Sequence, residues 1–408
     1  MTDLELLFLV LAVIYFWECA CWVPRGSVAF VTWFGRRWRP AHPGSLLGNQ
    51  RGGFVVAPPL PPLGTILVGN QFPVSISPES ILAFVSTSVN PAGRPLQSGE
   101  FLAFKEIKSV SAQGRRLVIN SSTFVRAASS SLAVKFARHV QELGALAADK
   151  RQNAIADIIN NSLDDKLLAR RWAEFQPLVA NIRPLTNFLF VWLFVLAPIF
   201  IWQFGFRSCW LGLLAGLLLA AIATAILFHR AHKALYPQAE EPRFTHFLTV
   251  LLSPATTVRA LDILSRPLLE DFHPLAIAKS FCPGMEFRAF AQRMLLELRQ
   301  PAWPVCPNPT PAAEAVEAHW RGAMLKAVEK FLKRSGLDPA DLTRPPAPTD
   351  ESCLSYCPRC LAQFTALEGS CSDCGGLPLV PFGVSRKNLR ESSADHSPSP
   401  ITKGRAPG

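Results

Sequence analysis

Several short motifs that mark common catalytic centres are absent from this sequence. It contains no HExxH pair of histidines, no Walker phosphate loop, no GxSxG nucleophile turn and no pair of acids in a context that suits acid–base catalysis. These absences argue against zincin peptidases, P-loop nucleotidases and hydrolases that depend on a GxSxG serine. The sequence therefore favours a non-enzymatic protein.

Charged residues are also scarce, at 17% of 408 residues, against 49% hydrophobic residues. Two long stretches have no charge at all, Phe188–Phe206 and Cys209–Phe228. About 20 apolar residues, each rising about 1.5 Å, span a hydrocarbon core of roughly 30 Å. Each stretch therefore predicts a transmembrane helix, and the short link between them predicts an antiparallel hairpin over residues 188–228. A buried soluble hairpin is the alternative, but neither stretch has a polar stripe.

Small residues recur at every fourth position of the second stretch, at Gly212, Gly216, Ala220 and Thr224. Residues with this spacing share one helix face, and small side chains allow two helices to approach closely. This face is expected to pack on a neighbouring helix. The neighbour could belong to the same chain or to a second copy, so a homo-oligomer remains open.

The first apolar segment, residues 4–23, could be a signal peptide or a signal anchor. A signal peptide has a basic start and a small-residue cleavage site, whereas this segment starts with acidic residues and has Trp17 and Trp22 near its end. A signal anchor is the better match. Arg25 and further arginines follow it, which predicts a cytoplasmic C-terminal end. Glu18 is either an interfacial residue beside the tryptophans or a proton or ion site.

Basic residues surround the predicted hairpin unevenly. Arg171 and Arg183 precede it and Arg230 and Lys233 follow it, whereas the loop offers only Arg207. Since basic flanks stay on the cytoplasmic side, the main domains should be cytoplasmic and the N-terminus outside. The net charge of +11 then suits anionic lipids of the bilayer better than nucleic acid, which is not an expected partner.

Residues 25–127 are expected to form a β-rich cytoplasmic domain. Short β-branched or aromatic runs between Gly, Pro and Asn predict strands over 27–34, 53–56, 65–68, 81–85 and 100–104. Residues 107–112 and 115–120, joined by Gln113-Gly114, predict a hairpin. A small β-barrel of the pleckstrin-homology type, closed by a helix, would explain these strands.

The start of this domain carries a family resemblance. Within residues 23–64, the stretch VPRGSVAFVTWFG is followed by Pro43-Gly44. This stretch resembles the opening of the stomatin/prohibitin/flotillin (SPFH) domain, which also follows a membrane anchor. The resemblance implies a membrane-attached SPFH-type fold. The chain departs from that family because it lacks a long coiled coil.

Apolar residues at helical spacing predict helices over 129–180 and again over 240–335. His229 and His232, three residues apart after the hairpin, could share a metal or could lie at the interface. The final segment, 385–408, is rich in Ser, Pro and basic residues and is expected to be disordered. The fold class is thus a membrane α+β protein with three transmembrane helices.

Five of the ten cysteines crowd into residues 353–382. Cys357 and Cys360 form one Cys-x-x-Cys pair, and Cys371 and Cys374 form a second, which is the spacing of a four-thiolate zinc site. Disulfides would require this segment to lie outside the cell, whereas cytoplasmic thiols stay reduced. Residues Tyr356–Phe382 resemble a short zinc ribbon, which implies structural Zn²⁺ on these four cysteines, with Cys353 as a spare thiol.

The expected function is an integral membrane scaffold or adaptor that uses the zinc ribbon, or the helices, to bind a protein partner. The alternative is a membrane enzyme or transporter subunit, with a site between the spans and residues 240–299. No motif identifies the partner or an activity.

Overall fold

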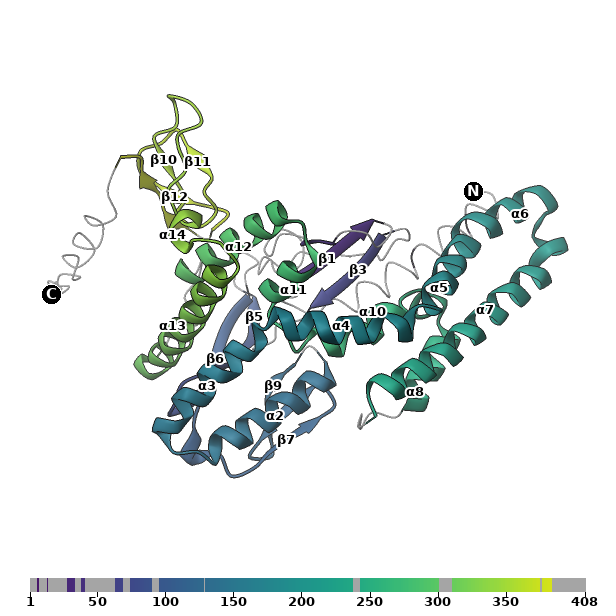
Figure 1. Cartoon of the computed structure of the whole chain (residues 1–408), viewed down its shortest axis with the longest axis horizontal. Helices are drawn as coiled ribbons and strands as arrows, with labels where there is room; N and C mark the ends of the chain where they lie inside the picture. Colours follow the sequence, from purple (N-terminus) through teal and green to yellow (C-terminus); the bar gives the residue numbers. More distant parts are fainter. Residues whose placement is uncertain are drawn as a thin grey trace, which may run out of the picture. The chain divides into compact units, whose positions relative to one another are not determined.

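The computed structural model describes residues 28–33, 38–40, 63–68, 74–89, 95–127, 129–237, 243–300, 310–374 and 376–383, with the single positions Leu6 and Val13. It is a mixed helix-and-sheet structure that divides into two compact units (Figure 1). Unit 1 comprises Met1–Leu295 and Pro304–Leu342, and unit 2 comprises Leu296–Trp303 and Thr343–Gly408. Most of the predicted anchor 4–23, the predicted strand 53–56 and the tail 385–408 lie outside the described residues.

The described strands of unit 1 form three antiparallel sheets of three strands each. Their orders are β2-β1-β3, β4-β5-β6 and β7-β8-β9. The bounds are β1 Val28–Trp33, β2 Trp38–Pro40, β3 Leu63–Val68, β4 Val74–Ile76, β5 Ser80–Val89, β6 Pro95–Ala103, β7 Val110–Gln113, β8 Arg116–Ile119 and β9 Ser122–Arg126. The predicted hairpin around Gln113-Gly114 is present as β7 and β8, and Gly114 has the positive φ (56°) that this tight turn requires.

Ten α-helices outside the hairpin are described, the last of them in the segment before unit 2. Their bounds are α2 Ser130–Gly144, α3 Ala148–Ser162, α4 Asp165–Val179, α8 Arg243–Leu252, α9 Pro254–Val258, α10 Ala260–Leu269, α11 Pro274–Phe281, α12 Gly284–Arg299, α13 Pro311–Arg334 and α14 Pro339–Leu342, and a 3₁₀ turn covers Phe104–Glu106. Ser129 caps α2 by accepting a hydrogen bond from the Leu132 N–H. Val316, Trp320 and Met324 of α13 are buried, and α13 contacts α3, β4 and β5. The apolar stripe of α13 therefore belongs to the core of unit 1.

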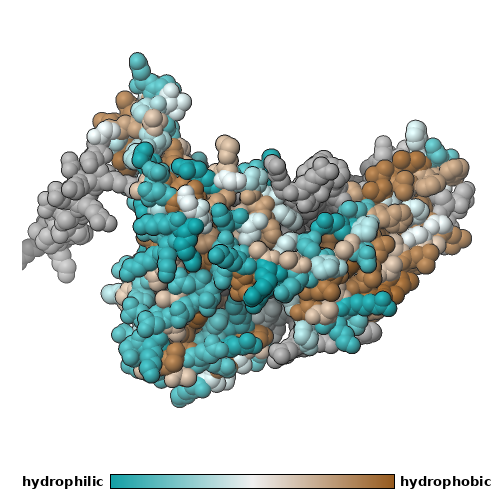
Figure 2. Space-filling model, viewed as in Figure 1, coloured by the Kyte–Doolittle hydropathy of each residue, from teal (hydrophilic) through white to brown (hydrophobic). Residues whose placement is uncertain are grey.

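The predicted hairpin is present as two adjoining helical stretches. The first runs through α5 (Ile182–Val191), a π-helical turn (Trp192–Leu196) and α6 (Ala197–Phe204), and the second is α7 (Phe206–Leu235). Gly205 joins them with a φ of 74°. The two uncharged stretches predict the link at Arg207-Ser208, so the observed link lies just before the predicted one. Figure 2 shows hydrophobic side chains gathered over these helices. Leu211–Leu235 of α7 is long and apolar enough to cross a membrane, and it is the one such helix among the described residues.

The π turn explains why the first stretch divides into two helices. The Ala197 N–H bonds the Trp192 carbonyl, five residues earlier. Pro198 follows at once, and it has no N–H with which to continue the α-helical ladder. The wider turn therefore accommodates the proline without ending the helical stretch.

The π turn also provides the neighbour for the small-residue face of α7. The Trp192 indole Nε1 donates a hydrogen bond to the Leu213 carbonyl at 3.1 Å. A Cβ on Gly216 would lie only 2.6 Å from Trp192 Cζ2. One turn further, Ala220 packs with Leu189 of α5. At these positions the neighbour is therefore a helix of the same chain.

The Gly216→Leu protein is expected to be less stable than the wild type by about 1–3 kcal/mol, because the added side chain overpacks the contact with Trp192. Thermal unfolding in detergent measures this difference. Gly212→Leu is the matched control, since Gly212 lies on the same helix with nothing within 4 Å of its Cβ position. Equal stability of the two variants would contradict the assigned contact.

Candidate metal centre

Unit 2 holds the two Cys-x-x-Cys pairs in turns between short strands. Its sheets have the orders β11-β10-β14 and β12-β13. The bounds are β10 Ser355–Tyr356, β11 Gln363–Phe364, β12 Ser370–Cys371, β13 Leu377–Pro378 and β14 Val380–Pro381. The first pair lies in the turn from β10 to β11, and the second starts at Cys371, the last residue of β12, and continues into the turn to β13. Each turn is therefore fixed at both ends by antiparallel pairing.

Backbone hydrogen bonds close both turns. The Leu361 N–H bonds the Cys357 carbonyl at 2.9 Å, and the Gly376 N–H bonds the Cys371 carbonyl at 2.8 Å. Both residues have a positive φ, 61° for Leu361 and 83° for Gly376. Glycine adopts this conformation freely, whereas Leu361 adopts it at a cost of about 1–2 kcal/mol. The first turn is therefore strained, at the position where the sequence lacks the glycine common in such turns.

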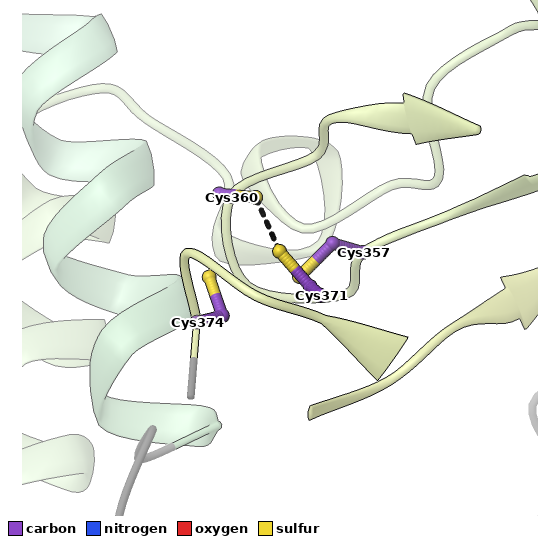
Figure 3. Close-up of side chains that lie close together, drawn as sticks. All are labelled: Cys357, Cys360, Cys371 and Cys374. Atoms are coloured by element: carbon purple, nitrogen blue, oxygen red, sulfur yellow. Dashed lines mark hydrogen bonds between the residues drawn. The ribbon is translucent and has the colours of Figure 1, made fainter. Parts of the chain in front are cut away.

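The four predicted ligands come together in one group (Figure 3). Their sulfur atoms all lie within 4.8 Å of one another, and the Cys360 and Cys371 sulfurs are 3.8 Å apart. Four sulfurs at about 2.3 Å from one tetrahedral ion would lie about 3.8 Å apart. All four cysteines are free of disulfides, and Cys353 lies outside the group. This group could hold a metal ion.

Ionising all four thiols of the group is unfavourable without a cation. A hydrogen bond from the Cys360 thiol lowers the pKa of Cys357 to about 5. The same contact raises the pKa of Cys360, while burial raises the pKa of Cys374 to about 12. One sulfur thus ionises readily and makes its neighbours harder to ionise. A bound divalent cation would supply the charge that allows four thiolates to share the site.

The core of unit 2 consists largely of these sulfurs. Cys357, Cys371, Cys374 and Leu379 form a buried cluster, and Phe364 and Leu377 pack against it. By residue type, Leu367 is expected to join Phe364 and Leu377 in this core, but it lies in the loop between β11 and β12 and is 53% exposed. Leu379 is buried in its place.

The other predicted candidates do not form a metal group within the described part of the chain. The His229 ring packs on Phe247, and the His232 ring packs between Phe228 and Tyr236. These contacts suit histidines at the end of an apolar helix. Glu18 lies outside the described residues.

A buried group of charges along α10 was not recognised in the sequence. Arg259 and Arg266 each place a guanidinium nitrogen near one oxygen of Asp262, at 2.8 and 3.2 Å. Beyond them Glu270 accepts hydrogen bonds from the hydroxyls of Ser129 and Ser131, at 2.5 and 2.9 Å. These four charged residues follow one another after three, four and four positions. Residues at these spacings share one face of a helix, so the spacing could have identified this face from the sequence.

No protein-family model, curated protein or solved structure matches the chain. The SPFH resemblance of residues 23–64 therefore has no further support. The function has to be argued from the group of cysteines and from the surfaces around it.

Proposed function

We propose that this protein is an integral membrane scaffold or adaptor, and that unit 2 is its zinc-ribbon module for protein contacts. The observation that carries the proposal is the group of four sulfurs within 4.8 Å of one another. Four thiolates complete the tetrahedral shell of Zn²⁺ and leave no position for a water or a substrate. The zinc is therefore structural, and the module binds partners instead of converting them.

Three membrane spans anchor the proposed protein, with the N-terminus outside, and with unit 2 and the remaining domains of unit 1 in the cytoplasm. The second and third spans are the two halves of the hairpin. Exposed apolar side chains along both halves support lipid contact, among them Val195, Ile199, Leu211, Leu218 and Ile222. Residues 4–23 provide the first span by composition. The basic flanks support the orientation and contact with anionic lipids.

The proposed partner surface is on the ribbon and not on α13, whose apolar face is buried in unit 1. Leu354 and Leu367 of unit 2 are 44% and 53% exposed. The Ser355 hydroxyl donates to the Ala366 carbonyl at 2.6 Å, so the two leucines flank residues in direct contact. These two exposed leucines are the proposed partner-binding residues of the ribbon.

The proposal predicts that Leu367→Asp and Leu354→Asp each reduce partner recovery about tenfold, which corresponds to about 1.4 kcal/mol of binding free energy. Tagged chains would be isolated in mild detergent, and co-purified proteins would be compared by quantitative mass spectrometry. Thr365→Asp is the matched control, since it adds the same charge at an exposed position two residues away. Zinc content should be equal in all variants.

Two outcomes would contradict the proposal. One is the recovery of the same proteins, in the same amounts, with all variants. The other is labelling of the ribbon in intact cells by a membrane-impermeant reagent, which would place unit 2 outside.

A membrane enzyme or transporter subunit is the second candidate. The observation that favours it is the buried charged face of α10, because α10 contacts both α5 and α7 of the hairpin. Buried ionisable groups next to membrane helices are common at sites of ion or substrate movement.

A further inference from the structure

Unit 1 contains a cavity of about 230 Å³ that the proposed function does not use. Residues of α2, α3 and α4 line it, together with Asp271 and Phe272, which follow α10. Its volume is somewhat below the roughly 300–1,000 Å³ of pockets for drug-sized ligands. It would therefore accept a small metabolite.

Two cations meet one carboxylate in the wall of this cavity. Lys135 Nζ lies 2.9 Å from Asp271 Oδ1, and Arg171 Nη1 lies 2.8 Å from Asp271 Oδ2. Each of the three side chains is between 35% and 43% exposed, so a ligand can reach them. His139 adds no charge at neutral pH, because burial and the nearby Lys135 lower its pKa. The lining thus carries one excess positive charge.

The apolar surface that a ligand can reach comes from aliphatic side chains. Ile158 and Leu167 line the cavity and are half-buried, whereas Phe136 and Phe272 are only 2% and 1% exposed. The Arg171 guanidinium carbon lies 5.6 Å from the centre of the Phe272 ring, which helps to hold the guanidinium in place. A ligand with an apolar part could pack on Ile158 and Leu167 while its charged group stays beside Arg171.

We propose that this cavity binds a small organic anion. Its carboxylate or phosphate group would lie between Lys135 and Arg171, and its apolar part would pack on Ile158 and Leu167. Asp271 holds the two cations in position when no ligand is bound. It also competes with the ligand for them, since it occupies the same donors.

Calorimetric titration of the full chain in detergent tests the proposal with phenyl phosphate as the probe. Phenyl phosphate should bind saturably and at least about tenfold more tightly than inorganic phosphate, which lacks the apolar part. Benzylamine, of similar shape and opposite charge, should not bind. Arg171→Gln should weaken phenyl phosphate about tenfold through the loss of one charged hydrogen bond. The neighbouring Arg170→Gln is the control and should bind as the wild type does.

Asp271→Asn separates an anion site from a merely structural ion pair. The proposal expects this variant to bind phenyl phosphate more tightly, because the competing charge is gone. Weaker binding by Asp271→Asn, no binding by the wild type, or equal binding of benzylamine would each overturn the proposal.

The phosphate group could come from a soluble metabolite or from a lipid headgroup. Repeating the titration in nanodiscs with and without phosphatidylglycerol distinguishes these sources. Competition by the lipid identifies a headgroup site, and unchanged phenyl phosphate binding identifies a soluble ligand. Either result supports an anion site.

Discussion

The Cys371→Ser protein is expected to lose its zinc and the fold of its ribbon while unit 1 stays folded. Cys371 is buried, and its sulfur lies 3.8 Å from that of Cys360, so a serine leaves a gap in the centre of the group. Beyond the sulfurs, the ribbon core contains little more than Leu379, Phe364 and Leu377. Each such side chain contributes about 1.5–3 kcal/mol at full burial, whereas zinc contributes about 10–16 kcal/mol in small finger peptides.

Two measurements on the purified protein check this expectation. Metal analysis should find about one zinc per wild-type chain, and limited proteolysis should cut the variant within residues 343–383 while unit 1 resists. Cys353→Ser is the matched control, since Cys353 lies in the same segment but outside the sulfur group. Full zinc in Cys371→Ser, or its loss in Cys353→Ser, would show that the ligand assignment is wrong.

Acid should destabilise unit 1 through His273. This side chain is buried, and its Nδ1 accepts the Leu275 N–H at 3.2 Å, so it caps α11 only while unprotonated. Burial lowers its pKa to about 4. At pH values between this pKa and the ordinary value of about 6.5, His273 binds a proton in the unfolded chain but not in the folded chain. The contribution of His273 is therefore complete above pH 6.5 and decreases as the pH falls, by about 2 kcal/mol at pH 5.

The His273→Asn variant isolates this effect, because asparagine also caps helices but does not titrate. Thermal unfolding of both proteins in detergent, from pH 7 to pH 5, measures it. Other acid-sensitive groups act equally on both proteins, so the wild type should lose about 2 kcal/mol more than the variant. Parallel pH profiles would rule out the proposed role of His273.

Patterns local in the sequence predicted the structure well. The apolar stripe of α13, the turn at Gly114 and the grouping of four cysteines all depend on residues close together in the chain. The position of the hairpin link was displaced to Gly205 because a positive φ, and not the first charge, ends the helix. The sequence also could not show that Trp192 faces Gly216, since that contact depends on the π turn before Pro198.

Contacts between residues far apart in the chain could not be predicted, because only the fold brings those residues together. The charges of α10 look like an ordinary solvated face until the fold places Ser129 and Ser131 against Glu270, about 140 positions away. The exposure of Leu367 depends on the length of a loop relative to its short strands, which residue type does not encode. The cavity beside Asp271 likewise exists only where three helices and one turn meet.

The charged face of α10 has a mechanical consequence for unit 1. It links the first residues of α2, through Glu270, to a helix that contacts α7. The Glu270 bonds to Ser129 and Ser131 join the end of α10 to the start of α2, and each hydrogen bond of this kind contributes about 0.5–3 kcal/mol. A tilt of α7 is therefore expected to move α10 and the start of α2 with it, so a movement of the apolar hairpin could reach the rest of unit 1 without any ligand.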